Sequence, residues 1–124
     1  MEKLYQANKD KAEFIMVYIK EAHPEDGWKV PVNEKAGITV NQPTTDKERD
    51  EVAKTCTEKL GLTIPCVVDG IDNKVGQEYA GWPDRAYIVG KDGKIFYKSG
   101  PGPAGFKVPE IAGKLEAVLK AGTK

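Results

Sequence analysis

The sequence predicts an α/β fold, and three observations support that class. Residues 13–19 and 64–68 are apolar at almost every position, as in strands that are buried on both faces of a parallel sheet. A helix-forming segment lies between them, which is the arrangement of a parallel crossover. Near the C-terminus, residues 91–94 carry Asp-Gly at their centre and predict a hairpin turn.

The first half of the chain predicts a helix, a strand, an irregular stretch and a second helix. Residues 1–11 predict a short polar helix with no capping residue before its start. Prolines and glycines interrupt residues 23–45, and so long a loop in a small domain usually has a function or is disordered. Thr45 and Glu48 have the spacing of a capping box, which begins a helix that runs to about Leu60.

The second half predicts a short helix, two further strands and a last helix. Asp72 or Asn73 opens the short helix. Residues 85–89 and 95–98 lie on either side of the hairpin turn, so we expect them to be antiparallel strands. Pro109 lies in the first turn of the last helix. The inner face of that helix carries Ile111, Leu115, Val118 and Leu119.

Composition and charge limit the function. The 124 residues fit a single domain with a modest core. Nineteen basic residues balance nineteen acidic ones, so no net field favours nucleic acid or an anionic membrane. No apolar run approaches the length of a membrane span, and no apolar signal segment opens the chain. We therefore expect a protein of the reducing, bacterial-type cytosol, without nucleic-acid or membrane partners.

The cysteines and the single histidine restrict metal and disulfide chemistry. Cys56 and Cys66 are too few for a disulfide framework, although a bridge between them is open on sequence grounds. With His23 they match no common zinc spacing, so we expect no metal. Cys66 falls in an apolar strand and Cys56 on an apolar helix stripe. Thiols in such places behave as small hydrophobic groups rather than as nucleophiles.

Glu21 and His23 are the candidate catalytic pair. They follow the strand predicted at residues 13–19, and open α/β sheets bind ligands at the carboxyl ends of their strands. A carboxylate two residues from an imidazole can set its tautomer and raise its basicity. Such a pair suits proton transfer to a leaving carbon or sulfur. The alternative is that both are solvated loop residues.

The order of the elements resembles a thioredoxin-like domain, a three-layer α/β/α fold around a mixed sheet. Such domains begin with a strand whose following turn holds the reactive cysteine, and they end in a β-hairpin and a helix. No strand precedes the first helix here, so the predicted domain lacks its first β-strand and is N-terminally incomplete. The strands at 13–19 and 85–89 would flank that strand. We expect them to pair directly, or to leave an edge through which the chain forms a homodimer.

The segment VYIKEAHPEDGW (17–28) resembles the signature of the iodothyronine deiodinase family and its bacterial homologues. The resemblance continues through IPCVVDGIDN (64–73), YAGWPDRAYIVGKDGKI (79–95) and the last helix. It implies a thioredoxin-like oxidoreductase whose nucleophile is a selenocysteine or a cysteine on the turn after the missing strand.

The resemblance also implies roles by position. Glu21 and His23 match the acid and the histidine implicated in catalysis. Trp28 matches an aromatic residue that follows them, and Arg49 matches a recurring arginine. We expect Trp28 and Arg49 to border the substrate groove.

The entry to the third strand is the other implied wall of the groove. Asp84 and Arg85 match an acid–arginine pair of the family. Pro83 stands where thioredoxin-like proteins place a cis proline opposite the reactive cysteine, so we expect the Trp82-Pro83 bond to be cis. Pro83 replaces a phenylalanine-like residue, and Pro43 replaces a second histidine of the animal enzymes. Both departures argue against thyroid hormone as the substrate.

These features predict a thiol- or selenol-dependent oxidoreductase domain that acts by reductive dehalogenation or by reduction of a peroxide or disulfide. An external thiol would regenerate it, and we expect no other cofactor. A UGA codon for selenocysteine, read as a stop, would restart the frame at Met1 and remove the nucleophile. A family member that lost its nucleophile is the alternative. We therefore expect this chain to be inactive alone, or to be a non-catalytic binding or scaffold protein that uses the same groove.

Overall fold

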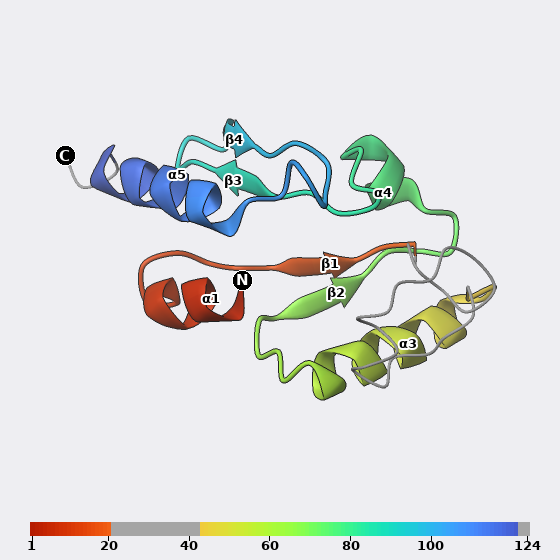
Figure 1. Cartoon of the computed structure of the whole chain (residues 1–124). Helices are drawn as coiled ribbons and strands as arrows, with labels where there is room; N and C mark the ends of the chain where they lie inside the picture. Colours follow the sequence, from red (N-terminus) through yellow and green to blue (C-terminus); the bar gives the residue numbers. More distant parts are fainter. Residues whose placement is uncertain (21–42, 122–124) are drawn as a thin grey trace.

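The computed structural model describes residues 1–20 and 43–121, and it shows a small α/β protein (Figure 1). Its described helices are α1 (Glu2–Asn8), α3 (Asp46–Lys59), α4 (Lys74–Glu78) and α5 (Val108–Ala121). Its described strands are β1 (Met16–Tyr18), β2 (Cys66–Val68), β3 (Tyr87–Val89) and β4 (Ile95–Lys98). The α/β class and the order of these elements are confirmed. β4 has the predicted bounds, whereas β1, β2 and β3 are shorter than predicted.

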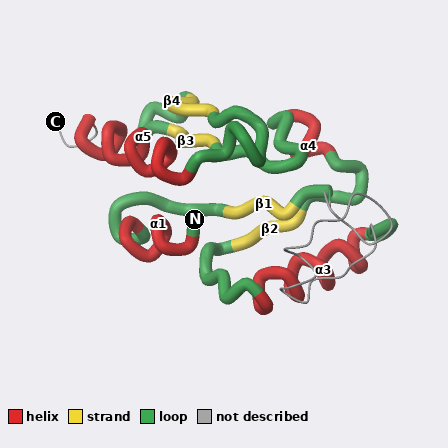
Figure 2. The backbone as a smooth tube through the Cα atoms, viewed as in Figure 1, coloured by secondary structure: helices red, strands yellow, loops and turns green. Residues whose placement is uncertain are grey.

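The described strands form two separate two-stranded sheets, which Figure 2 shows as two pairs of yellow segments. β1 is parallel to β2, with Met16 opposite Cys66 and Tyr18 opposite Val68. β3 is antiparallel to β4. The predicted single mixed sheet is therefore wrong for the described residues, and so is direct pairing of the first strand with the third. Strands pair only where their backbones approach to about 4.8 Å, and β1 and β3 each have only one such neighbour in the described part.

The parallel pair is less buried than a double-faced apolar strand would be. Val17 is 38% exposed and Val67 is 52% exposed. The two residues lie opposite each other in the register, so their side chains leave the sheet on the same face. The expectation that both faces of these strands are buried is wrong, because that face is only partly covered.

The capping box at the start of α3 is present in a slightly altered form. The Thr45 hydroxyl oxygen accepts a hydrogen bond from the Glu48 backbone N–H at 3.1 Å. Glu48 Oε2 in turn accepts from the Thr44 backbone N–H at 2.8 Å, one residue before the cap itself. α3 then packs on β2 and buries Ala53. This packing holds the N-terminal half of the described fold together.

The hairpin and α5 make up the C-terminal half. Gly93 has a φ of 77°, which a turn of this kind requires and glycine adopts without strain. The Tyr97 hydroxyl on β4 donates to Glu110 Oε1 on α5 at 3.0 Å, so the helix lies against the hairpin. Ile111 and Leu115 are buried, and the predicted inner face of the last helix is confirmed at these two positions.

Candidate functional site

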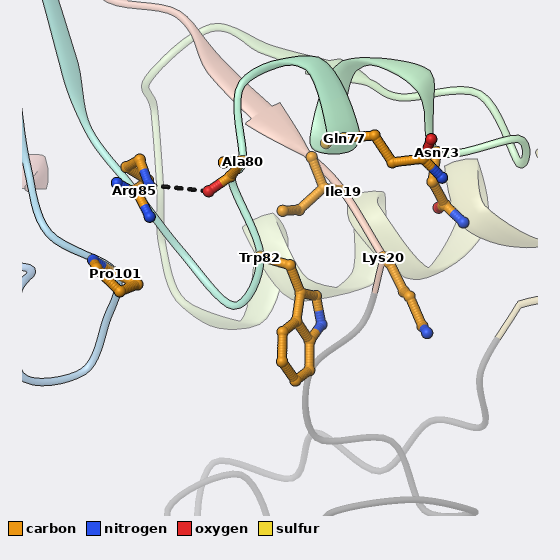
Figure 3. Close-up of a pocket in the computed structure, with 9 residues that line it drawn as sticks. Ile19, Lys20, Asn73, Gln77, Ala80, Trp82, Arg85 and Pro101 are labelled. Carbon is orange, nitrogen blue, oxygen red and sulfur yellow. Dashed lines mark hydrogen bonds between the residues drawn. The ribbon is translucent and has the colours of Figure 1, made fainter.

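A pocket of about 530 Å³ lies at the carboxyl end of β1, between α4 and the turn that leads to β3 (Figure 3). Ligands of open α/β sheets bind at such strand ends. Among the described lining residues, two follow β1 directly and the others come from the second half of the chain. The lining residues are Ile19, Lys20, Asn73, Gly76, Gln77, Ala80, Trp82, Arg85 and Pro101.

One wall of the pocket is Trp82, which directly precedes Pro83. The Trp82-Pro83 bond is cis, so that prediction is confirmed, and the Gly102-Pro103 bond is a second cis bond that the sequence did not suggest. The Trp82 ring is 48% exposed and lies between Arg85 and Lys20 in Figure 3. The pocket therefore has an aromatic wall. Pro83 itself is half-buried and is not among the lining residues.

Arg85 lies at one end of the pocket and is held by backbone carbonyls. Its Nε donates to the Ala80 carbonyl at 2.8 Å, which Figure 3 shows as a dashed line, and its Nη1 donates to the Ser99 carbonyl at 3.0 Å. Both acceptors are neutral, and the described lining residues include no aspartate or glutamate. The guanidinium thus adds a positive charge to the pocket.

Asp84 lies elsewhere. Its carboxylate is packed against Gly102, where an added Cβ would come within 1.5 Å of Asp84 Oδ1. The Gly102 N–H also donates to the Asp84 carbonyl at 3.0 Å. Asp84 is not among the lining residues, so the structure places its side chain on the 99–105 loop rather than in the pocket.

Arg49 lies behind the pocket wall rather than in it. Its side chain is fully buried, with 1% exposure. Nη1 donates to the Gly70 carbonyl at 2.6 Å, and Nη2 donates to Asn73 Oδ1 at 2.8 Å. Asn73 is a lining residue, so Arg49 reaches the pocket only through it.

Neither cysteine belongs to the pocket. No disulfide bond joins Cys56 and Cys66. Burial raises the pKa of the Cys66 thiol, and only a hydrogen bond with the Tyr18 backbone opposes that shift. A raised pKa disfavours the thiolate, which is the nucleophilic form. Within residues 1–20 and 43–121, no cluster of three His, Cys, Asp or Glu side chains could hold a metal ion.

Glu21, His23 and Trp28 lie outside the described residues, so their predicted roles remain predictions. Sequence reasoning missed Lys20 and Asn73 as pocket residues. The rule that ligands bind at the carboxyl ends of strands could have found both, since each follows an apolar strand within a few residues. The sequence instead indicated Asn73 as one of two residues that could begin a helix. Asn73 is indeed the N-cap of α4.

The fold and the pocket define a small α/β protein with a pocket at the carboxyl end of β1. Comparison with known proteins places it more narrowly. The family model described as iodothyronine deiodinase matches residues 1–119, and the chain belongs to that family.

Several named relatives are similar to this chain. The human type II iodothyronine deiodinase is 33% identical over 116 residues, which cover 92% of this chain and 42% of the relative. The thyroxine 5-deiodinase of Gallus gallus is 33% identical over 102 residues, 82% of this chain and 38% of the relative. The type I iodothyronine deiodinase of Xenopus laevis is 34% identical over 105 residues, which cover 85% of this chain and 39% of the relative. The chain thus spans about two fifths of the length of these relatives. Among the described helices, none has the length and apolar character needed to cross a bilayer.

Proposed function

We propose that this chain is part of a thiol- or selenol-dependent oxidoreductase with a thioredoxin-like fold, whose redox nucleophile lies outside these 124 residues. One observation carries the proposal. A chain of the deiodinase family has a pocket with an aromatic wall and a cationic end, yet both of its cysteines lie outside the lining. The pocket would receive the substrate, and the nucleophile would be supplied beside it.

The proposed dehalogenation has three balanced steps. The thiolate or selenolate takes the halogen from a carbon–halogen bond, and His23, oriented by Glu21, donates a proton to the carbon that is released. An external thiol then attacks the sulfur or selenium, forms a mixed disulfide or selenenyl sulfide, and releases halide with its proton. A second thiol restores the nucleophile and leaves as the external disulfide. With a peroxide as substrate, the nucleophile takes one oxygen, and the other leaves as water or an alcohol with the same proton.

A second candidate is a non-catalytic binding protein that uses the same pocket. It is favoured by the raised pKa of the Cys66 thiol, because burial disfavours the thiolate that a nucleophile requires. For either function, we propose a cytosolic protein whose partners are a small-molecule substrate or a thiol reductant. We further propose that the short chain forms a homodimer through an open sheet edge.

An activity assay separates the two functions. We would measure iodide release from 2-iodophenol, and hydrogen peroxide consumption, with dithiothreitol as the reductant. The chain alone is compared with a version extended upstream in its natural reading frame, with cysteine at the codon after the first apolar strand. We expect the extended protein to be active, its Cys→Ser variant to be inactive, and its His23→Gln variant to be strongly impaired.

The short chain should show no activity above the buffer. Activity in the short chain that is lost in Cys66→Ser would contradict the proposal, because the nucleophile would then be internal. An inactive extended protein that still binds small molecules in the pocket would favour the binding protein. The upstream DNA gives an independent check, since an in-frame apolar strand followed by UGA or a cysteine codon is expected.

A further inference from the structure

A buried arginine fixes the direction of one pocket side chain. Arg49 Nη2 donates to Asn73 Oδ1 at 2.8 Å. An arginine side chain has only donors, so the Asn73 atom that faces it must be the oxygen. The amide group of Asn73, Nδ2, therefore points away from Arg49. No residue in the described part of the chain accepts a hydrogen bond from it.

The turn that carries Asn73 is held firmly. The Asn73 N–H donates to the Gly70 carbonyl at 2.8 Å, and the Ile71 N–H donates to Asp46 Oδ1 at 2.7 Å. Arg49 Nη1 donates to the same Gly70 carbonyl. The backbone and the side chain of Asn73 are thus both constrained, which keeps the entropic cost of presenting Nδ2 to a ligand low.

Lys20 supplies a second donor at the same end of the pocket. Figure 3 shows Lys20 and Asn73 on the side of Trp82 away from Arg85. The Lys20 ammonium has no partner among the described residues, and no carboxylate is among the lining residues in that part of the chain. The charge of Arg49 lies directly behind Asn73, and its own acceptors are neutral oxygens. This end of the pocket therefore offers donors and positive charge, which complement an anionic acceptor.

Apolar side chains lie beside these donors. Figure 3 shows Ile19 and the Trp82 ring between the two donors and Arg85. We propose that Lys20 and Asn73 form a subsite for the carboxylate of a small organic acid whose apolar body rests on Trp82. In this subsite Arg49 is a positioning residue that keeps the Asn73 amide turned toward the ligand. The inference does not depend on the proposed redox function, because it requires only the pocket.

Two probes that differ only in charge test the subsite. Binding of 3-phenylpropionate and of its neutral amide, 3-phenylpropanamide, is followed by the ¹⁵N–¹H signals of the Asn73 side-chain amide. We expect the carboxylate to shift these signals and to bind at least about tenfold more tightly than the amide, as a charge-assisted hydrogen bond would give. Equal binding of the two probes would overturn the proposal.

Asn73→Asp separates binding from folding. The new carboxylate keeps the shape of the side chain and pairs with Arg49, but its second oxygen would repel an anionic ligand. We expect about a tenfold or greater loss of 3-phenylpropionate binding with no loss of thermal stability. If Asn73→Asp bound 3-phenylpropionate as tightly as the parent, the proposed subsite would be wrong.

Two further variants complete the test. Lys20→Gln should weaken 3-phenylpropionate binding severalfold and provides an independent readout should Asn73→Asp fail to fold. Lys74→Gln removes an exposed charge outside the lining and serves as the matched control, with binding unchanged. Arg49→Lys removes the second donor of the guanidinium fork, so the Asn73 amide signals should move even without ligand. Unmoved signals in Arg49→Lys would contradict the positioning role.

Discussion

At the scale of single residues, environment decides which of the polar side chains can do chemistry. Cys66 illustrates this. From the sequence alone its thiol could be a redox group, but its position in β2 leaves it half-buried. Burial raises the pKa of that thiol, so the protonated form persists at neutral pH. The interpretation of Cys66 as a small hydrophobic residue is in keeping with this shift.

Cys66 should therefore react slowly with thiolate-selective reagents. In a Cys56→Ser variant at pH 8, we expect iodoacetamide to alkylate Cys66 at least about threefold more slowly in the folded protein than in urea. Mass spectrometry of timed samples measures both rates. Equal rates would show that burial does not protect the thiol.

The same shift predicts a pH dependence of stability. The folded state keeps the Cys66 proton above pH 9.0, the ordinary pKa, whereas the unfolded state loses it. The stabilisation is thus fully present below that pH and is lost as the pH rises toward the folded pKa. Cys66→Ala should flatten the alkaline decline in the free energy of unfolding that urea titrations measure.

At the scale of elements, local signals in the sequence were sufficient to predict where the helices lie. The start of α3 follows from side chains within four residues of one another, namely Thr44, Thr45 and Glu48. Hydrogen bonds from the Thr44 backbone N–H and then from its hydroxyl lower the pKa of the Glu48 carboxyl. Such bonds require no tertiary contact, which is why the sequence could predict them.

Removing the cap should weaken the protein measurably. Thr45→Ala leaves the Glu48 N–H without its acceptor, and we expect a loss of about 1 kcal/mol in the free energy of unfolding. Lys54→Ala, on the exposed side of the same helix, is the matched control and should change it little. A Thr45→Ala variant as stable as the parent would mean that the cap contributes nothing.

The lowered pKa of Glu48 predicts the direction in which stability changes with pH. Because its folded pKa is depressed, its contribution is present above pH 4.5, the ordinary value, and is lost as the pH falls through the folded pKa. Glu48→Gln should therefore reduce the acid-side loss of stability between about pH 5 and pH 3, relative to the parent. Parallel acid profiles for the two proteins would contradict this assignment.

At the scale of the whole molecule, the main feature is a sheet in two parts. β1 uses one edge to pair with β2, through bonds such as Met16 N–H to the Pro65 carbonyl and Asp69 N–H to the Tyr18 carbonyl. Backbone groups that face the other edge of β1 have no partner strand in the described part. Ile15, which directly precedes β1, is 66% exposed. An open edge with apolar side chains favours pairing with another chain.

We expect the short chain to be a dimer, with twice the 13.6 kDa mass of one chain by light scattering. Val17→Lys should yield the monomer, since a lysine on an edge strand opposes edge-to-edge pairing. Ile95→Lys, on the exposed surface of β4, is the control and should leave the dimer intact. A monomeric parent, or a dimer unaffected by Val17→Lys, would rule out this interface. The extended protein should be monomeric if its upstream strand covers the edge.

The sequence predicted some residues of the candidate site better than others. The cis bond at Trp82-Pro83 was predicted for two reasons. The cis isomer costs little free energy before a proline, and the resemblance to thioredoxin-like proteins indicated this position for a cis proline. Arg49 was expected at the groove, yet it is buried behind Asn73, because its exposure depends on how α3 packs against the turn after β2. Asn73 was assigned to a helix start, and nothing in its neighbours indicates which way its amide points.

The sequence by itself determined the elements and the family. Apolar runs, the capping residues and the Asp-Gly turn are local signals, and local hydrogen bonds and periodicity act over a few residues. Only the tertiary structure decided that β1 and β3 do not pair, that Asp84 packs on Gly102, and that the pocket at the end of β1 presents Lys20 and Asn73. The physical reason is distance along the chain. Strand pairing and burial join residues dozens of positions apart, and their outcome depends on which other edges and faces are available.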